Sequence, residues 1–271
     1  MEQLPELGQS TSFELAIPVH SCFFDHAVNG KPVLPAVEAM EILTGFASNK
    51  LSSNCENYLF NASFGKFLPL SPQKDSVDAI IEVERVEDSV FKASLQTKVQ
   101  YTSGISRRLT HASVHYTNEI PPLTNDLIEI DIQPTQNQIT AAEIYRDIIP
   151  FGKNYQNLRD PIEMTPQHVT SGLYSGAKLA GERKLGSPFT LDAAFHSACA
   201  WGERLHQKVI YPIGFGKRYI PKPTSFESSY KGVVIFKETQ SQIFLFDLFI
   251  LDMNGNLREV VFDLQMKEIP A

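Results

Sequence analysis

Cysteine and long apolar runs are both scarce in this chain of 271 residues. The three cysteines, Cys22, Cys55 and Cys199, are scattered and form no CxxC pair, which excludes a disulfide framework and indicates a reducing compartment. No apolar run reaches the length of a membrane span, and the acidic, polar start MEQLPELGQS does not have the pattern of a signal peptide. We therefore expect a cytoplasmic protein with no membrane span.

Concentrated positive charge is also lacking. The formal net charge is −7 and no long basic run occurs, which argues against nucleic acid as a partner, because phosphate binding needs a basic face. The chain contains no GxGxxG motif and no P-loop, and its GLYSG segment is not a GxSxG elbow. Its 42% of hydrophobic and 20% of charged residues are ordinary for a soluble globular protein.

The first part of the chain has the pattern of one helix and a run of antiparallel strands. Apolar residues between positions 35 and 47 recur at helical spacing. Strand patterns bounded by turn residues cover 13–19, 59–68, 77–86, 90–101 and 106–116. The adjacent Pro121 and Pro122 cannot lie inside a strand ladder, so we expect a connector at 120–125.

The second part repeats this order. We expect a short helix at 141–150, a longer helix from about Asp192 to His206, and strands at 128–134, 168–176, 231–238, 241–251 and 257–268, the last two joined by an Asn-Gly hairpin signal. The helix starts LPAV (34–37) and LDAA (191–194) can be aligned. This indicates two copies of one unit, with both helix starts near a shared seam where pockets often form.

A histidine lies just before the first helix. His26, Gly30 and Pro35 have the spacing HxxxGxxxxP, in which Gly30 allows a sharp turn and Pro35 fits the first helical position. The free amides of Ala36 and Val37 could hold a carbonyl oxygen as negative charge develops on it, and His26 could remove a neighbouring proton. A histidine that is merely hydrogen-bonded in a loop fits the same residues.

Asp192 and His196 lie four residues apart, on one face of the second helix. Asp192 could also be an ordinary helix cap, although Phe195 three residues later does not complete a capping box. His111 and His115 lie four residues apart in a predicted strand, so their side chains should share one face. No third ligand lies nearby, so ordinary exposed or packed histidines are a better interpretation than a metal site.

These motifs resemble those of the dehydratase domains of polyketide synthases and polyunsaturated fatty acid synthases, in family order and over nearly the whole chain. DHAVNGKPVLPAV (25–37) is similar to their HxxxGxxxxP motif and LDAAFH (191–196) to their DxxxQ/H motif. GKNYQNL (152–158) is similar to GxxYGPxF and keeps Gly152 and Tyr155. LTHASVHY (109–116) and YPIGFGKRYIPKP (211–223) also resemble family segments. The departures, QN for the usual GP, Leu158 for Phe and Ala36 for a frequent glycine, leave the shape of the pocket open.

The resemblance implies a double hotdog fold of the α+β class. Residues 1–120 would form one unit and carry the catalytic histidine, and residues 121–271 a second unit that carries the catalytic aspartate. It also implies elimination of water from a 3-hydroxyacyl thioester to give the trans-2-enoyl thioester, in polyketide or fatty acid synthesis. The substrate would be carried on the phosphopantetheine arm of an acyl carrier protein, with no other cofactor and no metal.

The resemblance assigns roles residue by residue. His26 would be the general base at Cα, and Asp192 would act on the departing β-hydroxyl. His196 and Tyr155 would orient groups around Asp192, and the amide of Ala36 would hold the thioester carbonyl. Gly30 and Pro35 belong to the same motif and shape the helix start.

The carrier protein and other synthase domains or subunits are the expected partners, together with a possible homodimer. Carrier proteins are generally acidic and this chain is acidic too, so docking requires a local basic patch. The candidates are Lys217, Arg218 and Lys222, together with Arg183 and Lys184 before the second long helix. Arg218 is favoured for the phosphate because its fork binds phosphate bidentately. Ordinary solvated charges explain the same residues equally well.

Other functions on the same scaffold stay open at the level of sequence. A product-template-like cyclase or a double-bond isomerase also uses a histidine and an aspartate, so the motifs do not exclude them. A non-catalytic module that binds acyl carriers ranks below these enzymes, because both His26 and Asp192 are present.

Overall fold

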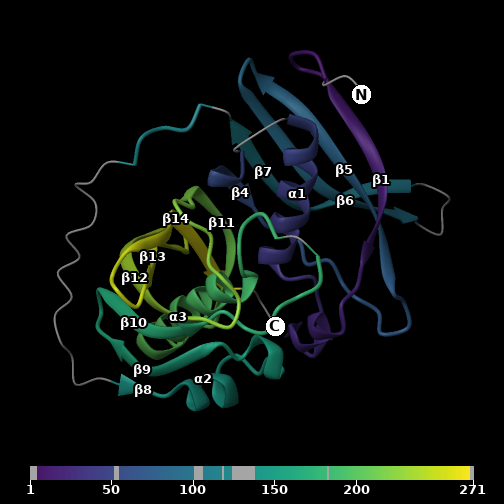
Figure 1. Cartoon of the computed structure of the whole chain (residues 1–271). Coiled ribbons are helices and arrows are strands. Elements are labelled where there is room, and N and C mark those ends of the chain that lie inside the picture. The colour runs from purple at the N-terminus through teal and green to yellow at the C-terminus, as the bar shows by residue number, and fades with distance from the viewer. Residues whose placement is uncertain are drawn as a thin grey trace.

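The computed structural model describes residues 5–51, 55–100, 106–117, 119–123, 138–181 and 183–268 (Figure 1). The first half has one long helix, α1 (Ala36–Leu51), and five strands: β1 (Ser10–Pro18), β4 (Tyr58–Ser63), β5 (Ser76–Glu87), β6 (Val90–Gln100) and β7 (Ser106–Thr117). The helix packs mainly on β6 and β7. Between β1 and α1 lie a 3-10 helix, η1 (Ser21–Asp25), and a two-stranded hairpin of β2 (Ala27–Val28) and β3 (Lys31–Pro32). A second 3-10 helix, η2 (Cys55–Asn57), precedes β4.

The second half also has one long helix, α3 (Pro188–His206), which packs on strands at the lower left of Figure 1. Its strands are β8 (Gln138–Ile139), β9 (Leu158–Met164), β10 (His168–Tyr174), β11 (Ile210–Tyr219), β12 (Ser229–Gln240), β13 (Ile243–Asp252) and β14 (Leu257–Glu268). The short helix α2 (Ala141–Asp147) and the 3-10 helix η4 (Lys153–Tyr155) lie between β8 and β9.

A single twelve-stranded sheet contains both halves, and its strand order is nearly a palindrome. The order β1-β5-β6-β7-β4 in the first half is mirrored by β11-β14-β13-β12-β10 in the second, with β9 and β8 added beyond β10. Each half runs strand, helix and then four strands along the chain, and the halves join where β4 pairs antiparallel with β11. The duplicated unit and the double hotdog architecture predicted from the sequence are therefore confirmed.

Burial explains why each helix lies against its sheet. Met40 and Leu43 of α1 are fully buried, as are Phe195 and Trp201 of α3, so each helix directs its largest side chains into the core. Removing such apolar area from water is the main term that holds helix to sheet. The two helices also pack on each other, and one continuous core runs through both halves. The seam between the halves is therefore part of the protein interior.

The structure corrects two sequence predictions. α3 begins at Pro188, one turn before Asp192, because the proline occupies the first turn, where its missing N–H costs little. The counterpart of Pro35 is thus Pro188, and the alignment of LPAV with LDAA is wrong. β9 was not predicted, because Pro161 inside it argues against a strand; it lies in the outer part of the sheet, beside the short edge strand β8.

Other predictions fall outside the described residues. The strand expected at 128–134 lies there, as do residues 124 and 125 of the expected connector. Residues 120–123, with Pro121 and Pro122, are described and belong to no helix or strand, as expected for a connector, and the boundary between units at residues 120 and 121 stays a prediction. Among the helices that the structure describes, none is long and apolar enough to cross a membrane.

Candidate active site

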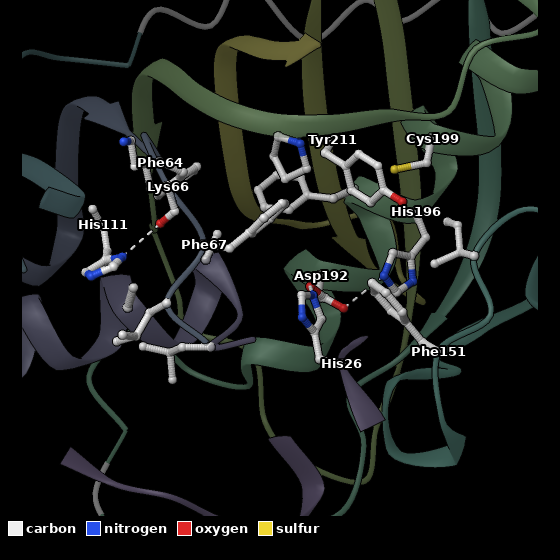
Figure 2. Close-up of a pocket in the computed structure, with 18 of the residues that line it drawn as sticks. His26, Phe64, Lys66, Phe67, His111, Phe151, Asp192, His196, Cys199 and Tyr211 are labelled. Carbon is white, nitrogen blue, oxygen red and sulfur yellow. Dashed lines mark hydrogen bonds and ion pairs between the residues drawn. The ribbon is translucent and has the colours of Figure 1, made fainter. Parts of the chain in front are cut away.

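A cavity at the seam brings the two sequence motifs together (Figure 2). It contains about 730 Å³ of empty space, part of it open to solvent, and most of its wall is apolar. His26 from the first half and Asp192 from the second both line it, with His26 Nε2 3.8 Å from Asp192 Oδ1. Two residues far apart in sequence therefore face one another across one cavity.

Local backbone structure positions His26. It follows η1 directly, its amide donates to the Phe23 carbonyl, and its carbonyl accepts from the Val33 amide. Between β2 and β3 the chain reverses through Asn29 and Gly30, with φ of 50° and 73°. This conformation favours glycine and asparagine, and it returns the chain toward the start of α1. Gly30 is exposed and does not line the cavity, so it acts through the shape of the hairpin.

Asp192 lies within α3 and not at its cap, so its side chain is available to the cavity. One carboxylate oxygen faces His26, and the other lies 3.0 Å from His196 Nε2. The latter contact is close but poorly aligned for a hydrogen bond. Asp192 and His196 are 5% and 3% exposed, so the carboxylate is held between two imidazoles in a largely dry environment.

Tyr145 was not anticipated from the sequence. Its hydroxyl lies 3.1 Å from His196 Nδ1 and accepts a hydrogen bond from the Leu158 amide. A hydroxyl that accepts from Leu158 is free to donate to Nδ1, and this would leave the proton of His196 on Nε2, the atom that faces Asp192. The sequence holds no spacing signal for this contact, because Tyr145 lies on α2 and His196 on α3.

Aromatic rings pack against His26, and its burial lowers its pKa. The ring of Phe151 lies 4.3 Å from that of His26 and 5.2 Å from that of His196, between centroids, and the ring of Tyr155 lies 5.2 Å from His26. Burial lowers the pKa of His26 to about 4, although the Asp192 carboxylate opposes this shift. His26 is consequently neutral near pH 7 and able to accept a proton.

Asp25, next to His26, joins this loop to the other half of the chain. The carboxylate of Asp25 accepts from the amide and side chain of Asn154, and the Asp25 carbonyl accepts from the Gly152 amide. A Cβ on Gly152 would lie 2.3 Å from Asp25 Cγ, so only glycine fits there. The glycine of the GKNYQNL motif is therefore explained by the close approach of the residue next to His26.

The start of α1 presents free amides beside the catalytic pair. The Pro35 carbonyl accepts from the amides of Glu38 and Ala39, which begin the helical hydrogen bonding. The amides of Ala36 and Val37 precede these, as the first donors of a helix do. Ala36 lines the cavity, whereas Pro35 is buried behind it. This end of the helix can stabilise negative charge on an oxygen held there.

Tyr155 is placed differently from its expected position. It is fully buried but does not line the cavity, and its ring packs edge-on against Phe189 and His26. Burial, together with the carboxylates of Glu38 and Asp192, raises the pKa of its hydroxyl well above the ordinary value. No hydrogen bond joins Tyr155 to Asp192 in the described part of the chain, and Tyr145 is the tyrosine that contacts His196.

The structure contradicts the expectation that Arg218 binds the phosphate of a carrier. Arg218 is 3% exposed, its Nε lies 2.8 Å from Glu259 Oε1, and its Nη1 contacts the sulfur of Met40. A guanidinium already paired in the core cannot reach a phosphate in solvent. Lys217 and Lys222 are exposed and stay candidates for docking.

The two strand histidines do not share a face. β6 and β7 change register between Leu95 and Gln96, which forms a bulge at His111 and turns this side chain into the cavity wall. There His111 contacts Thr97 Oγ1 and the Lys66 carbonyl. His115 instead contacts the Asn61 carbonyl and the ring of Phe60. Within the described residues, no group of His, Cys, Asp and Glu side chains could hold a metal ion.

Comparisons with solved structures identify the fold. The chain is similar to the dehydratase domain of the CurF module of curacin polyketide synthase, with a TM-score of 0.77 and 18% identity over 99% of this chain and 96% of that one. It is also similar to the dehydratase domain of PpsC from Mycobacterium tuberculosis, with a TM-score of 0.75 and 15% identity over 97% of this chain and 94% of that one. A complex of that PpsC domain with C12:1-CoA matches with a TM-score of 0.74 and 14% identity over 96% and 94%.

No protein-family model matches the sequence, and no curated protein matches it. At this level of identity the likeness shows the fold alone, which is the double hotdog of polyketide synthase dehydratase domains over nearly the whole chain.

Proposed function

We propose that this protein is a 3-hydroxyacyl thioester dehydratase that acts on substrates carried by an acyl carrier protein, in polyketide or fatty acid synthesis. The observation that carries the proposal is the pairing of His26 and Asp192, 3.8 Å apart, in one apolar cavity beside a free helix start. Elimination of water needs a base for the hydrogen on Cα and an acid for the hydroxyl on the adjacent Cβ. Two groups a few ångströms apart can serve both carbons at once.

His26 is the base in this proposal. Its neutral imidazole takes the Cα proton on Nε2, the nitrogen that faces the cavity and Asp192. The electron pair of the broken C–H bond forms the Cα–Cβ double bond. A general base of this kind contributes roughly two to four orders of magnitude to the rate.

Asp192 is the acid. As the Cβ–O bond breaks, its carboxyl gives a proton to the departing oxygen, which leaves as water. His26 is then protonated and Asp192 ionised, and passage of the proton from Nε2 to Oδ1 restores both groups. His196 contacts the other carboxylate oxygen and orients it, and Tyr145 orients His196.

The helix start supports the same reaction. Negative charge develops on the thioester oxygen as the Cα proton is removed, and the Ala36 amide would donate to that oxygen. The apolar wall, including Phe195 and Ile149, fits the acyl chain. The substrate's thioester arm would belong to an acyl carrier protein that docks near Lys217 and Lys222, and other synthase domains or subunits would supply and consume its cargo. The buried, free thiols of all three cysteines support a reducing compartment, the cytoplasm.

The test is chemical. The protein is incubated with a 3-hydroxyacyl thioester of pantetheine, and separately with the same acyl group on a carrier protein, and the products are followed by mass spectrometry. We expect loss of water to give the 2-enoyl thioester with wild-type protein and a large loss of rate with Asp192→Asn, which keeps the side-chain shape but cannot act as an acid. If the hydroxyacyl substrate is left unchanged, migration of the double bond in a 2-enoyl thioester would favour an isomerase, ring closure of a polyketone thioester a cyclase, and binding without any reaction a non-catalytic carrier module.

A further inference from the structure

Two acidic side chains of α1 reach across the seam to the segment that leads into α3. Glu41 accepts hydrogen bonds from the amides of Lys184 and Leu185. One turn earlier, Glu38 Oε2 pairs with the guanidinium of Arg183 at 2.5 Å. The helix of the first half thus holds three consecutive residues of the second half.

The Glu38–Arg183 pair is unusual in its burial. The side chains are 2% and 9% exposed, whereas the surface pair of Lys98 and Glu14 is mostly open to solvent. Like His26 and Asp192, the two residues come from different halves of the chain. Burying two charges costs free energy that only good geometry offsets, so such a pair is weak evidence for stability by itself.

The pair connects the two ends that carry the catalytic groups. Glu38 lies two residues after Ala36, at the helix start that follows the His26 hairpin. Arg183 lies five residues before Pro188, where α3 begins. Ser187, which lies between Arg183 and Pro188, is bound to the rest of the second half: its hydroxyl donates to the Ser175 carbonyl and its amide to Thr224 Oγ1. The segment that Glu38 holds through Arg183 is therefore tied to the body of the second half that carries α3 and Asp192, and the ion pair connects this body to α1.

Groups of both charge signs surround Glu38 and shift its pKa in opposite directions. Burial raises its pKa to about 7, Arg183 opposes the shift, and the carboxylates of Glu41 and Asp192 add to it. From η1, Cys22 faces Glu38, and burial raises the thiol pKa to about 11; from η4 the Tyr155 hydroxyl also faces it, with a raised pKa. Neither Cys22 nor Tyr155 changes charge near neutral pH. The carboxyl groups of Glu38 and Glu41 have raised pKa values, which shift their ionisation from the acidic range toward neutral pH.

We propose that Glu38 and Arg183 are positioning residues, whose buried ion pair sets the register of the α3 start against α1 and thereby the distance between Asp192 and His26. This inference rests on the proposed dehydratase function. Misplacement of a catalytic group by about 1 Å can reduce a rate by roughly a hundredfold, so a pair that touches no substrate can still control turnover.

Positioning and direct electrostatics predict different results for two single variants. Glu38→Gln removes a negative charge near Asp192, and Arg183→Met removes a positive one, so a purely electrostatic role would change kcat in opposite directions. A positioning role predicts that both variants lower kcat, by about tenfold to a hundredfold, with KM within about threefold. The double variant, Glu38→Gln with Arg183→Met, leaves no buried charge unpaired and should fold even where a single variant does not; it should lose no more than the worse single variant.

The pH profile gives a second readout. Above its pKa of about 7, Glu38 is ionised and holds Arg183, so wild-type kcat should fall as the pH drops through about 7. In Glu38→Gln this fall should be absent. In Glu41→Gln it should remain, because Glu38 and Arg183 are unchanged, although glutamine keeps only one of the two hydrogen bonds, since the amides of Lys184 and Leu185 donate to different oxygens of Glu41. Glu259→Gln breaks a buried pair within the second half and is the control for loss of an ion pair as such; its kcat should stay within about threefold of wild type.

The outcomes separate the two claims. Wild-type protein that eliminates no water would refute the proposed function and leave nothing for the pair to position. Active wild-type protein together with a folded double variant of unchanged kcat, or single variants with opposite effects, would overturn the positioning role while the dehydratase function stands.

Discussion

At the scale of single residues, Tyr145 is the side chain whose importance only the fold reveals. Its hydroxyl connects His196 Nδ1 to the Leu158 amide, both of them buried. Tyr145→Phe removes the hydroxyl and keeps the ring, so we expect kcat to fall about tenfold with little change in KM, as His196 loses its orientation. Stability should fall by about 1–3 kcal/mol, because the Leu158 amide is left without its partner. Turnover equal to wild type in steady-state assays would remove Tyr145 from the site.

The depressed pKa of His26 has a consequence for stability. The folded protein resists protonation of His26 until about pH 4, whereas the unfolded chain takes up this proton near the ordinary value of 6.5. Stability is therefore fully present above pH 6.5 and decreases as the pH falls toward 4, by on the order of 3 kcal/mol from this residue. We expect His26→Leu to unfold in urea with a weaker pH dependence over this range. Parallel curves for the two proteins would mean that His26 titrates normally.

At the scale of elements, the contact between η1 and η4 fixes the His26 loop. Gly152→Ala would push a methyl group into Asp25, so we predict a lower kcat, by about tenfold or more, measured with a short pantetheine substrate. Gly45→Ala is the matched control: nothing lies within 4 Å of its added methyl group, and alanine in the middle of α1 should stabilise the protein by about 0.5–1 kcal/mol without loss of activity. Equal activity of the two variants would show that the Asp25 contact does not position His26.

The elements also show where sequence patterns stop being informative. Hydrophobic periodicity located α1 and most strands, because one-sided burial imposes a period on the chain. It misplaced the start of α3, where the strong cap signal of Asp192 competed with the helix-starting Pro188. The prediction for His111 failed because a bulge breaks the alternation of side chains along the strand. The prediction for Arg218 failed because the sequence does not distinguish an arginine paired inside the core from one exposed to solvent.

At the scale of the whole molecule, the repeat was visible in the sequence but the seam was not. Two copies of helix-then-strands predict two similar units, and the palindromic strand order confirms them. Which strands join the units depends on the β4–β11 pairing, and a local pattern does not specify such a long-range contact. The motifs predicted that His26 and Asp192 belong to one site; the contacts of Asp25, Glu38 and Tyr145 that hold this site cross between elements and leave no spacing signal.

The central claim, that the two halves meet to place one base and one acid in one cavity, is tested most directly by a single-turnover rate. The measurement compares wild-type protein, His26→Ala and His115→Ala with a 3-hydroxyacyl pantetheine thioester. His115 is the control, because it is a half-buried histidine whose contacts lie outside the cavity. We predict that folded His26→Ala loses roughly two to four orders of magnitude while His115→Ala stays within about threefold of wild type. Near-normal elimination of water by folded His26→Ala would contradict the account.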